Sequence, residues 1–144
     1  MRSQAMKISL AMLVIVSAVL PSIAPRQAGA AGKYDGSVPM ICSASAVTEC
    51  EPGRRCQPRK AEHVNLPELF RVDAKAMKVR NLEAEKGRES PIRNLDHANG
   101  AMVLQGADAD RGWTVVIHEE TGRMSATVSA DGEGFVVFGQ CGLP

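Results

Sequence analysis

Residues 113–139 read WTVVIHEETGRMSATVSADGEGFVVFG, and this stretch decides the fold class of the chain. Apolar and polar residues alternate in residues 113–119 and again in 123–130, and residues 134–139 are mainly apolar. A glycine-containing turn separates each segment from the next. Alternation with a period of two is typical of β-strands, and such turns connect antiparallel neighbours. The stretch therefore predicts three consecutive antiparallel strands.

The two turns also predict the register of these strands. We expect Glu120 opposite Arg123, and Ala130 opposite Glu133, because each turn then closes over two residues. One face of the three strands becomes continuously apolar in this register, as a face packed on a core requires. The predicted pairs on this face are Ile117–Ala126, Val115–Val128, Val128–Phe135 and Ala126–Val137.

The opposite face of the same strands carries Val116, His118, Val136 and Phe138, which is unusually apolar for an outer face. Two interpretations stay open. The N-terminal segment covers this face, or a bulge re-aims the last strand. Alternatively, the four residues form a binding patch for a partner or ligand.

The rest of the chain predicts further short strands at residues 38–47, 91–95 and 101–105, and residues 69–72 form a short apolar piece after Pro67. Residues 74–86 contain good helix formers, yet Met77 and Val79 alternate with basic residues. We favour a strand over residues 76–82 and leave a helix open. Residues 49–60 are expected to form a loop. Short strands at regular spacing indicate an all-β fold, a small single-domain antiparallel barrel or sandwich.

Residues 1–30 have the pattern of a helical secretory signal peptide. Arg2 and Lys7 precede an apolar run over residues 8–20, and Ala28-Gly29-Ala30 supplies small residues for cleavage. The run has 13 residues, fewer than the roughly 20 that a membrane-spanning helix needs. We therefore expect a mature domain over residues 31–144, in the periplasm or secreted, that does not span the membrane.

Four cysteines in an exported chain allow three pairings, and we favour Cys50–Cys56 and Cys42–Cys141. The first pair flanks a Pro-Gly turn, and the second lies at the two ends of the mature domain. Zinc sites usually have paired C-x₂₋₄-C spacings, and haem attachment needs C-x-x-C-H; neither pattern is present. A catalytic thiol stays open, but an even cysteine count favours structural disulfides.

Composition and motifs point to no particular chemistry. Loss of residues 1–30 changes the formal net charge from +1 to −2, which does not favour nucleic-acid binding. His63, His97 and His118 lie in different segments, and no nucleophile, zinc-protease or phosphate-loop motif is present. The Asp108-x-Asp110 pair resembles the start of a calcium loop, but an acidic turn is the simpler interpretation. We single out no catalytic residue, metal ligand or cofactor.

Several short motifs occur in an order that resembles a known family. They are Tyr34-Asp35-Gly36-Ser37, Cys50-x₅-Cys56, Asn65-Leu66-Pro67, Ser90-Pro91-Ile92, Leu104-Gln105-Gly106, Trp113-x₃-Ile117 and Phe135-Val136-Val137-Phe138-Gly139-x-Cys141. In this order the mature chain resembles a family of small exported proteins of Gram-negative bacteria to which no activity is assigned. The resemblance implies an envelope location and oxidised cysteines, and it implies no functional residue.

Three functions follow as hypotheses. The first is a non-enzymatic binding module for an envelope protein or a small apolar ligand. The second is an enzyme with a dispersed site that uses His118 or His97 with nearby carboxylates. The third is a structural envelope protein. A closed cavity lined by Trp113, or an exposed patch of Val116, Val136 and Phe138, would favour binding, whereas a histidine–carboxylate pair in a cleft would favour the enzyme.

Overall fold

The computed structural model describes residues 33–83 and 87–144. The predicted signal peptide, residues 1–30, lies outside the described residues. The strands are β1 (Met40–Cys50), β2 (Gln57–Arg59), β3 (Leu69–Asp73), β4 (Lys78–Asn81), β5 (Glu89–Ala98), β6 (Ala101–Asp108), β7 (Arg111–His118), β8 (Arg123–Ala130) and β9 (Glu133–Gly142), with a 3₁₀ helix η1 (Ala61–Val64) after β2.

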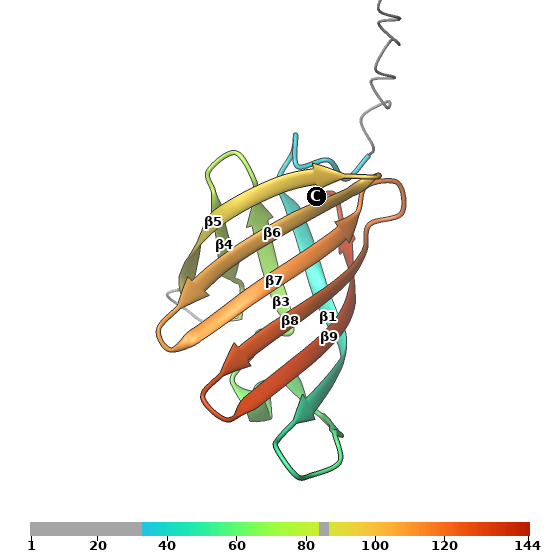
Figure 1. Ribbon diagram of the computed structural model, residues 1–144. Coiled ribbons are helices and arrows are strands. Elements are labelled where there is room, and N and C mark those ends of the chain that lie inside the picture. Colours follow the sequence, from blue (N-terminus) through green and yellow to red (C-terminus); the bar gives the residue numbers. More distant parts are fainter. Residues whose placement is uncertain (1–32, 84–86) are drawn as a thin grey trace, which may run out of the picture.

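The strands form one antiparallel sheet that closes on itself (Figure 1). The order runs from β1 through β3 to β9, and β9 pairs with β1 to complete an eight-stranded barrel. The short strand β2 pairs only with residues 47–49, near the C-terminal end of β1, and extends the sheet beyond the barrel wall. The all-β prediction is therefore confirmed, and the architecture is a barrel rather than a sandwich.

Closure of the barrel rests on the long pairing of β1 with β9. Cys42 lies directly opposite Cys141 in this pairing, and a disulfide joins them. The second disulfide joins Cys50 to Cys56 at the β1–β2 hairpin. Both pairs are those predicted from the sequence. Two disulfides are typical of proteins that fold outside the reducing cytoplasm.

The prediction that residues 49–60 form a loop is wrong in part. Glu49 and Cys50 continue β1, and Gln57–Arg59 pairs with residues 47–49 of that strand. The Cys50–Cys56 disulfide and the Arg59–Glu49 ion pair (2.6 Å) hold the two strands together. Pro58 is tolerated because β2 is an edge strand, where a missing N–H breaks no ladder.

The predicted register between β7 and β8 is wrong by two residues. Ile117 lies opposite Met124, and Val115 opposite Ala126, because residues 119–122 form a four-residue connection. Gly122 adopts a positive φ of 72° and its N–H donates to the His118 carbonyl (2.8 Å). A shift of two keeps each residue on its predicted face. The β8–β9 register agrees with the prediction, with Val128 opposite Phe135.

Other strand positions agree with the prediction to within a few residues. The ambiguous segment before residue 83 contains the strand β4, which pairs with both β3 and β5. The first strand begins at Met40 and runs to Cys50, later than residues 38–47, because it pairs along β9 from Ile41 opposite Gly142 to Cys50 opposite Gly134.

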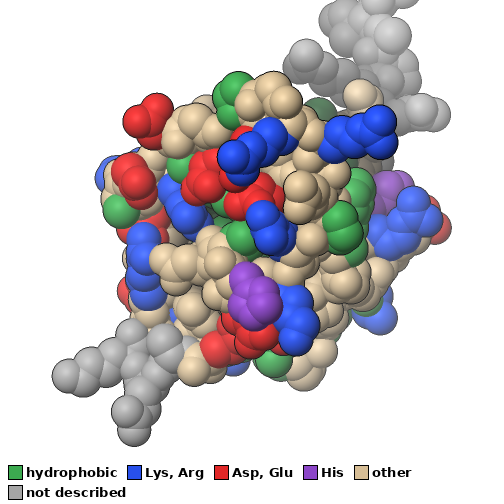
Figure 2. Space-filling model, turned by 90° about the horizontal axis from the view of Figure 1, so that it is seen from below, with side chains coloured by type: hydrophobic (Ala, Val, Ile, Leu, Met, Phe, Trp, Pro, Cys, Tyr) green, Lys and Arg blue, Asp and Glu red, His purple; other side chains and the backbone are tan. Residues whose placement is uncertain are grey.

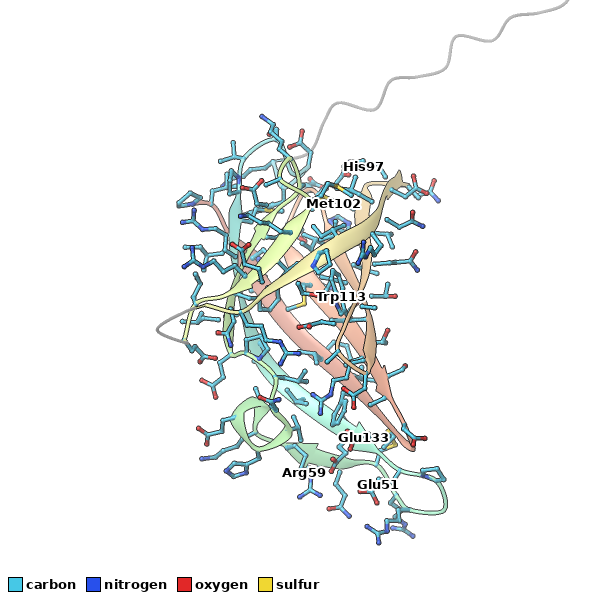
Figure 3. All side chains as sticks on the ribbon, turned by 90° about the vertical axis from the view of Figure 1, so that its left-hand side faces the viewer. Glu51, Arg59, His97, Met102, Trp113 and Glu133 are labelled. Carbon is cyan, nitrogen blue, oxygen red and sulfur yellow. A yellow bond between two sulfur atoms is a disulfide. The ribbon has the colours of Figure 1, made fainter. Side chains whose placement is uncertain are left out.

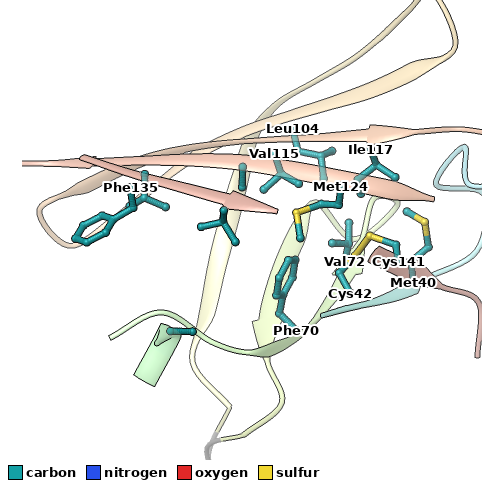
Figure 4. Close-up of a cluster of buried hydrophobic side chains, with 14 of the residues drawn as sticks. Met40, Cys42, Phe70, Val72, Leu104, Val115, Ile117, Met124, Phe135 and Cys141 are labelled. Carbon is teal, nitrogen blue, oxygen red and sulfur yellow. A yellow bond between two sulfur atoms is a disulfide. The ribbon is translucent and has the colours of Figure 1, made fainter. Parts of the chain in front are cut away.

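One end of the barrel interior is filled by side chains (Figure 4). We call it the closed end. Its inward side chains expose 0–3 % of their surface: Met40, Cys42, Val72, Met102, Leu104, Ile117, Met124 and Cys141. The segment before β1 runs over this end, where Tyr34 N–H donates to the Glu119 carbonyl (2.8 Å). Three methionines among these residues fit the irregular space because their side chains are flexible.

Candidate ligand-binding cavity

The other end of the barrel, which we call the open end, holds a cavity of ≈ 620 Å³. Eight-stranded barrels have an interior wide enough either to be filled by side chains or to hold one small ligand. This barrel does both, one at each end. The cavity is lined by Asn65, Leu66, Pro67, Phe70, Val79, Asn81, Arg88, Ser90, Asp108, Ala109, Asp110, Arg111, Trp113, Val115, Ala126, Val128 and Val137.

The wall of the cavity is apolar, and Trp113 on β7 is its largest side chain. Figure 3 shows Trp113 between Met102 near the closed end and Glu133 near the open end. The indole N–H of Trp113 donates to the Ser90 hydroxyl (2.9 Å). This bond satisfies the one polar group of the indole and fixes the ring against the wall.

Gly106 on β6 makes room for this tryptophan. The two residues lie opposite each other in the β6–β7 pairing. A Cβ atom at Gly106 would lie 2.2 Å from Cζ2 of Trp113 and 2.5 Å from the Pro91 carbonyl oxygen. A bulge in β5 between Ile92 and Asn94 brings this neighbouring strand close on the other side. Only glycine allows the indole to lie across β6, an arrangement known as aromatic rescue of a strand glycine.

Solvent reaches into the cavity. The inward residues of its wall retain small exposed fractions, 5 % for Val137 and 9 % for Val128, whereas most inward side chains of the closed end have none. The difference arises within single strands, since Val128 and Met124 both belong to β8. The cavity is therefore a mouth into the barrel and not a sealed void.

Charged residues stand at the rim of the cavity. Arg88, just before β5, donates through Nε to Oδ2 of Asp108 at the end of β6 (2.6 Å). This hydrogen bond, together with the charge of Asp108, raises the pKa of the Arg88 guanidinium. Asp110 lies in the turn that follows. The rim thus places both signs of charge beside an apolar wall.

Arg111 ties a strap across part of the open end. The strap comprises residues 60–68, including η1, and Leu66 and Pro67 line the cavity. Nη1 of Arg111 donates to the Val64 carbonyl (2.9 Å), and Nη2 lies 3.5 Å from Glu133. The guanidinium also lies over the Phe135 ring, 5.4 Å from its centroid. These contacts hold the strap in place without filling the space behind it.

The four residues of the predicted patch lie on the outside of the barrel, as expected. Phe138 is 52 % exposed, His118 is exposed, and Val116 and Val136 are half-buried. Phe138 lies in one row with Ser125 and Val116, whereas His118 is not in that row. The bulge in β1 between Ala44 and Ala46 does not turn Phe138 inward. A binding role for this face stays a prediction.

None of the three histidines is among the residues that line the cavity. His97 Nδ1 is 2.5 Å from a carboxylate oxygen of Glu119, and this pair is at the closed end of the barrel (Figure 3). His63 is on η1, 3.5 Å from Glu62, with both side chains exposed. The predicted histidine–carboxylate pair therefore exists for His97, and neither residue lines the cavity.

Sequence reasoning named Trp113 as a cavity residue but missed the rest of the lining. Within residues 33–83 and 87–144, no helix has the length and the apolar character that a bilayer crossing requires. In the same residues, no group of three or more potential metal-binding side chains comes together.

Fold and site together define a class: a disulfide-closed, eight-stranded antiparallel barrel with a cavity at one end. No protein-family model, curated protein or solved structure matches this chain.

Proposed function

We propose that this protein is a non-enzymatic binding protein that holds one small ligand with an apolar body inside the barrel. The observation that carries the proposal is the open cavity of ≈ 620 Å³ with Trp113 in its wall. Ligand sites are typically preformed, largely apolar hollows of about 300–1,000 Å³ with a few polar groups that orient the ligand. Both the size and the lining of this cavity fit that description.

The other two hypotheses have less support. The described lining contains no histidine or cysteine, and the Ser90 hydroxyl accepts the Trp113 indole N–H instead of facing a general base. A purely structural barrel would gain stability from a filled interior, because an empty volume forfeits packing contacts. The open half of this interior is unfilled, which favours binding.

The proposal includes an envelope location, periplasmic or secreted, after removal of residues 1–30. The signal-peptide pattern and the two disulfides support it. A ligand in this compartment is a small amphiphile or lipid-like molecule, because such molecules are abundant near membranes and need an apolar site in water.

Trp113 supplies the experiment, because it is the only tryptophan of the chain. Decyl glucoside, titrated below its critical micelle concentration, should shift the emission of Trp113 to shorter wavelength with a saturable, one-to-one curve. Native mass spectrometry should show one added probe per chain.

Matched variants separate cavity binding from surface adsorption. Ala126→Leu adds three carbons inside the cavity, and Ala46→Leu adds the same group to an exposed residue of β1. We expect Ala126→Leu to weaken binding at least about tenfold, a loss of about 1.4 kcal/mol, and Ala46→Leu to bind as the wild type does. Equal binding by the two variants would contradict the proposal.

A further inference from the structure

The rim of the cavity contains information about the polar part of the ligand. We infer that the cavity takes an amphiphile whose polar head carries no net charge and bears several hydroxyl or amide groups. This inference rests on the proposed function and extends it from an apolar body to a particular kind of head.

The first observation is the balance of charge at the rim. The lining contains two arginines, Arg88 and Arg111, and two aspartates, Asp108 and Asp110. Figure 2 views the barrel from the open end and shows Lys and Arg side chains intermingled with Asp and Glu side chains. A field of one sign would attract an opposite charge over a distance, and this rim has none.

The second observation is that the arginines are already engaged. Arg111 uses Nη1 for the Val64 carbonyl, faces Glu133 with Nη2 and packs on Phe135. Arg88 uses Nε for Asp108. A carboxylate or phosphate head is bound best by two parallel N–H bonds from one arginine. The charge of Arg88 is already balanced by Asp108 at Nε, so an anionic head that approaches the guanidinium also approaches this carboxylate.

A cationic head meets the opposite obstacle. Asp108 is paired with Arg88, so a cation that approaches Asp108 also approaches the guanidinium. Asp110 stands close enough to Arg88 to raise its pKa through its charge, so it too shares that positive neighbour. Bringing either ion from water to this rim removes solvation without supplying an unopposed partner.

The third observation is hydrogen-bonding capacity of both kinds. The Ser90 oxygen accepts from Trp113, which leaves the hydroxyl hydrogen to donate. Asn81 accepts from the Glu83 N–H through Oδ1, which leaves its amide NH₂ group to donate. The Asp110 carboxylate lines the cavity and is an acceptor of hydrogen bonds. A head with several hydroxyl or amide groups satisfies donors and acceptors together, and an ion satisfies only one kind.

The test compares three probes with different heads: decyl glucoside, decyltrimethylammonium and decanoate, whose apolar chain is one carbon shorter than the decyl chain. Each is titrated below its critical micelle concentration, with Trp113 emission and calorimetry as readouts. We expect the glucoside to bind at least about tenfold more tightly than either ion, with little change between low and physiological salt. Tightest binding by one of the ions would overturn the inference.

Two rim variants sharpen the test. Asp108→Asn leaves an excess of positive charge and should strengthen decanoate binding, whereas Arg88→Gln should strengthen binding of decyltrimethylammonium. Arg123→Gln changes an exposed arginine on β8 at the closed end and should change neither. Thermal melts show whether each variant is folded, and the comparison of probes on the wild type does not depend on them.

The failure of this inference and the failure of the proposed function give different results. If all three probes bind equally well and the rim variants do not change their affinities, the cavity binds apolar bodies without distinguishing head groups. In that case only this inference fails. If no probe binds to the wild type or to the Ala46→Leu control, and both proteins are folded, the proposed function fails as well as this inference.

Discussion

The two ends of this barrel are built from the same strands but packed differently. At the closed end, methionines, aliphatic residues and the Cys42–Cys141 disulfide leave no space. At the open end, Ala126 and Val128 on β8 face the cavity, and the space at Gly106 on β6 is taken by the Trp113 ring. Within β8, the side chains are thus smaller at the cavity than at the closed end, where Met124 fills the interior.

The difference shows how stability and function are separated within one small domain. The closed end supplies buried apolar surface and the covalent link that closes the sheet. The open end gives up packing contacts and surrounds the empty space with paired charges and a strap. Departures from ideal packing are expected where a protein binds something. The first three predictions below each compare a change at one end with a matched change elsewhere in the barrel.

Removal of the Cys42–Cys141 disulfide should have the largest effect. The bridge joins residues 99 positions apart, and in the chain-entropy model a loop of about 100 residues is worth about 4.7 kcal/mol. The double variant Cys42→Ala/Cys141→Ala should therefore lose roughly this much in urea unfolding. Cys50→Ala/Cys56→Ala opens a loop of sequence separation 6 and should lose only about 2 kcal/mol. Equal losses would show that barrel closure does not depend on the longer bridge.

Shortening a valine to alanine should lower the free energy of unfolding more at the closed end than at the open end. Val72 on β3 is fully buried and lies opposite Met40 of β1, whereas Val128 faces the cavity. Val72→Ala leaves a new void, so we expect a loss of about 2–3 kcal/mol, and Val128→Ala only enlarges an existing hollow, for about 1 kcal/mol. Equilibrium unfolding measures both. A larger loss for Val128→Ala would mean that the open end is packed.

A methyl group at Gly106 should disturb the open end specifically. It would collide with the Trp113 ring and the Pro91 carbonyl, so Gly106→Ala should cost about 1–3 kcal/mol and change the Trp113 emission. Gly112 on β7 is the control, because a Cβ atom there has no neighbour within 4 Å. Gly112→Ala should leave emission and stability nearly unchanged. Identical spectra for wild type and Gly106→Ala would contradict the placement of the indole.

Most of the fold could be predicted from the sequence, because alternation and glycine turns are local signals. The Asp131-Gly132 turn gave the correct β8–β9 register. The β7–β8 register was wrong because the four-residue connection depends on Glu119, whose N–H donates to the Gly100 carbonyl of another hairpin. The choice between barrel and sandwich depends on the β1–β9 pairing, and only the cysteine spacing hinted at it.

The cavity could be predicted only in outline. Trp113 was a candidate because of its size, but its neighbours come from distant segments, such as Phe70 on β3 and Arg88 before β5. The rim pairs depend on side-chain positions, as in the contact of Arg88 with Asp108 across 20 residues. Once the register of β6 and β7 is known, the pairing of Gly106 with Trp113 is a signal that the indole lies across β6.

Phe138→Ser tests whether the outer face contributes to stability. Phe138 is half exposed beside Ser125 and Ala46, and cross-strand contacts of this kind contribute about 0.2–1 kcal/mol. We expect a loss in that range by urea unfolding, with unchanged decyl glucoside binding in the cavity. A loss of several kcal/mol would show that Phe138 belongs to a packed region, and lost probe binding would assign a binding role to the outer face.

The smallest expected effect concerns Asp35, in the segment that covers the closed end. Hydrogen bonds from Ser37, first from its side chain and then from its backbone N–H (2.8 Å), lower the pKa of Asp35 below 3.8. Between these residues, Gly36 packs so closely that a Cβ atom would lie 2.9 Å from Sδ of Met102. A carboxyl whose pKa is lowered by folding stabilises the fold above pH 3.8, and the stabilisation is lost as the pH falls through the folded-state value.

Asp35→Asn should therefore melt at a slightly lower temperature than the wild type at neutral pH, and this difference should disappear in acid. Ser37→Ala should reproduce part of this pattern, because it removes the first of the two hydrogen bonds. A gap that stays constant from neutral pH to pH 2 would show that the ionised Asp35 does not help to hold this segment over the closed end.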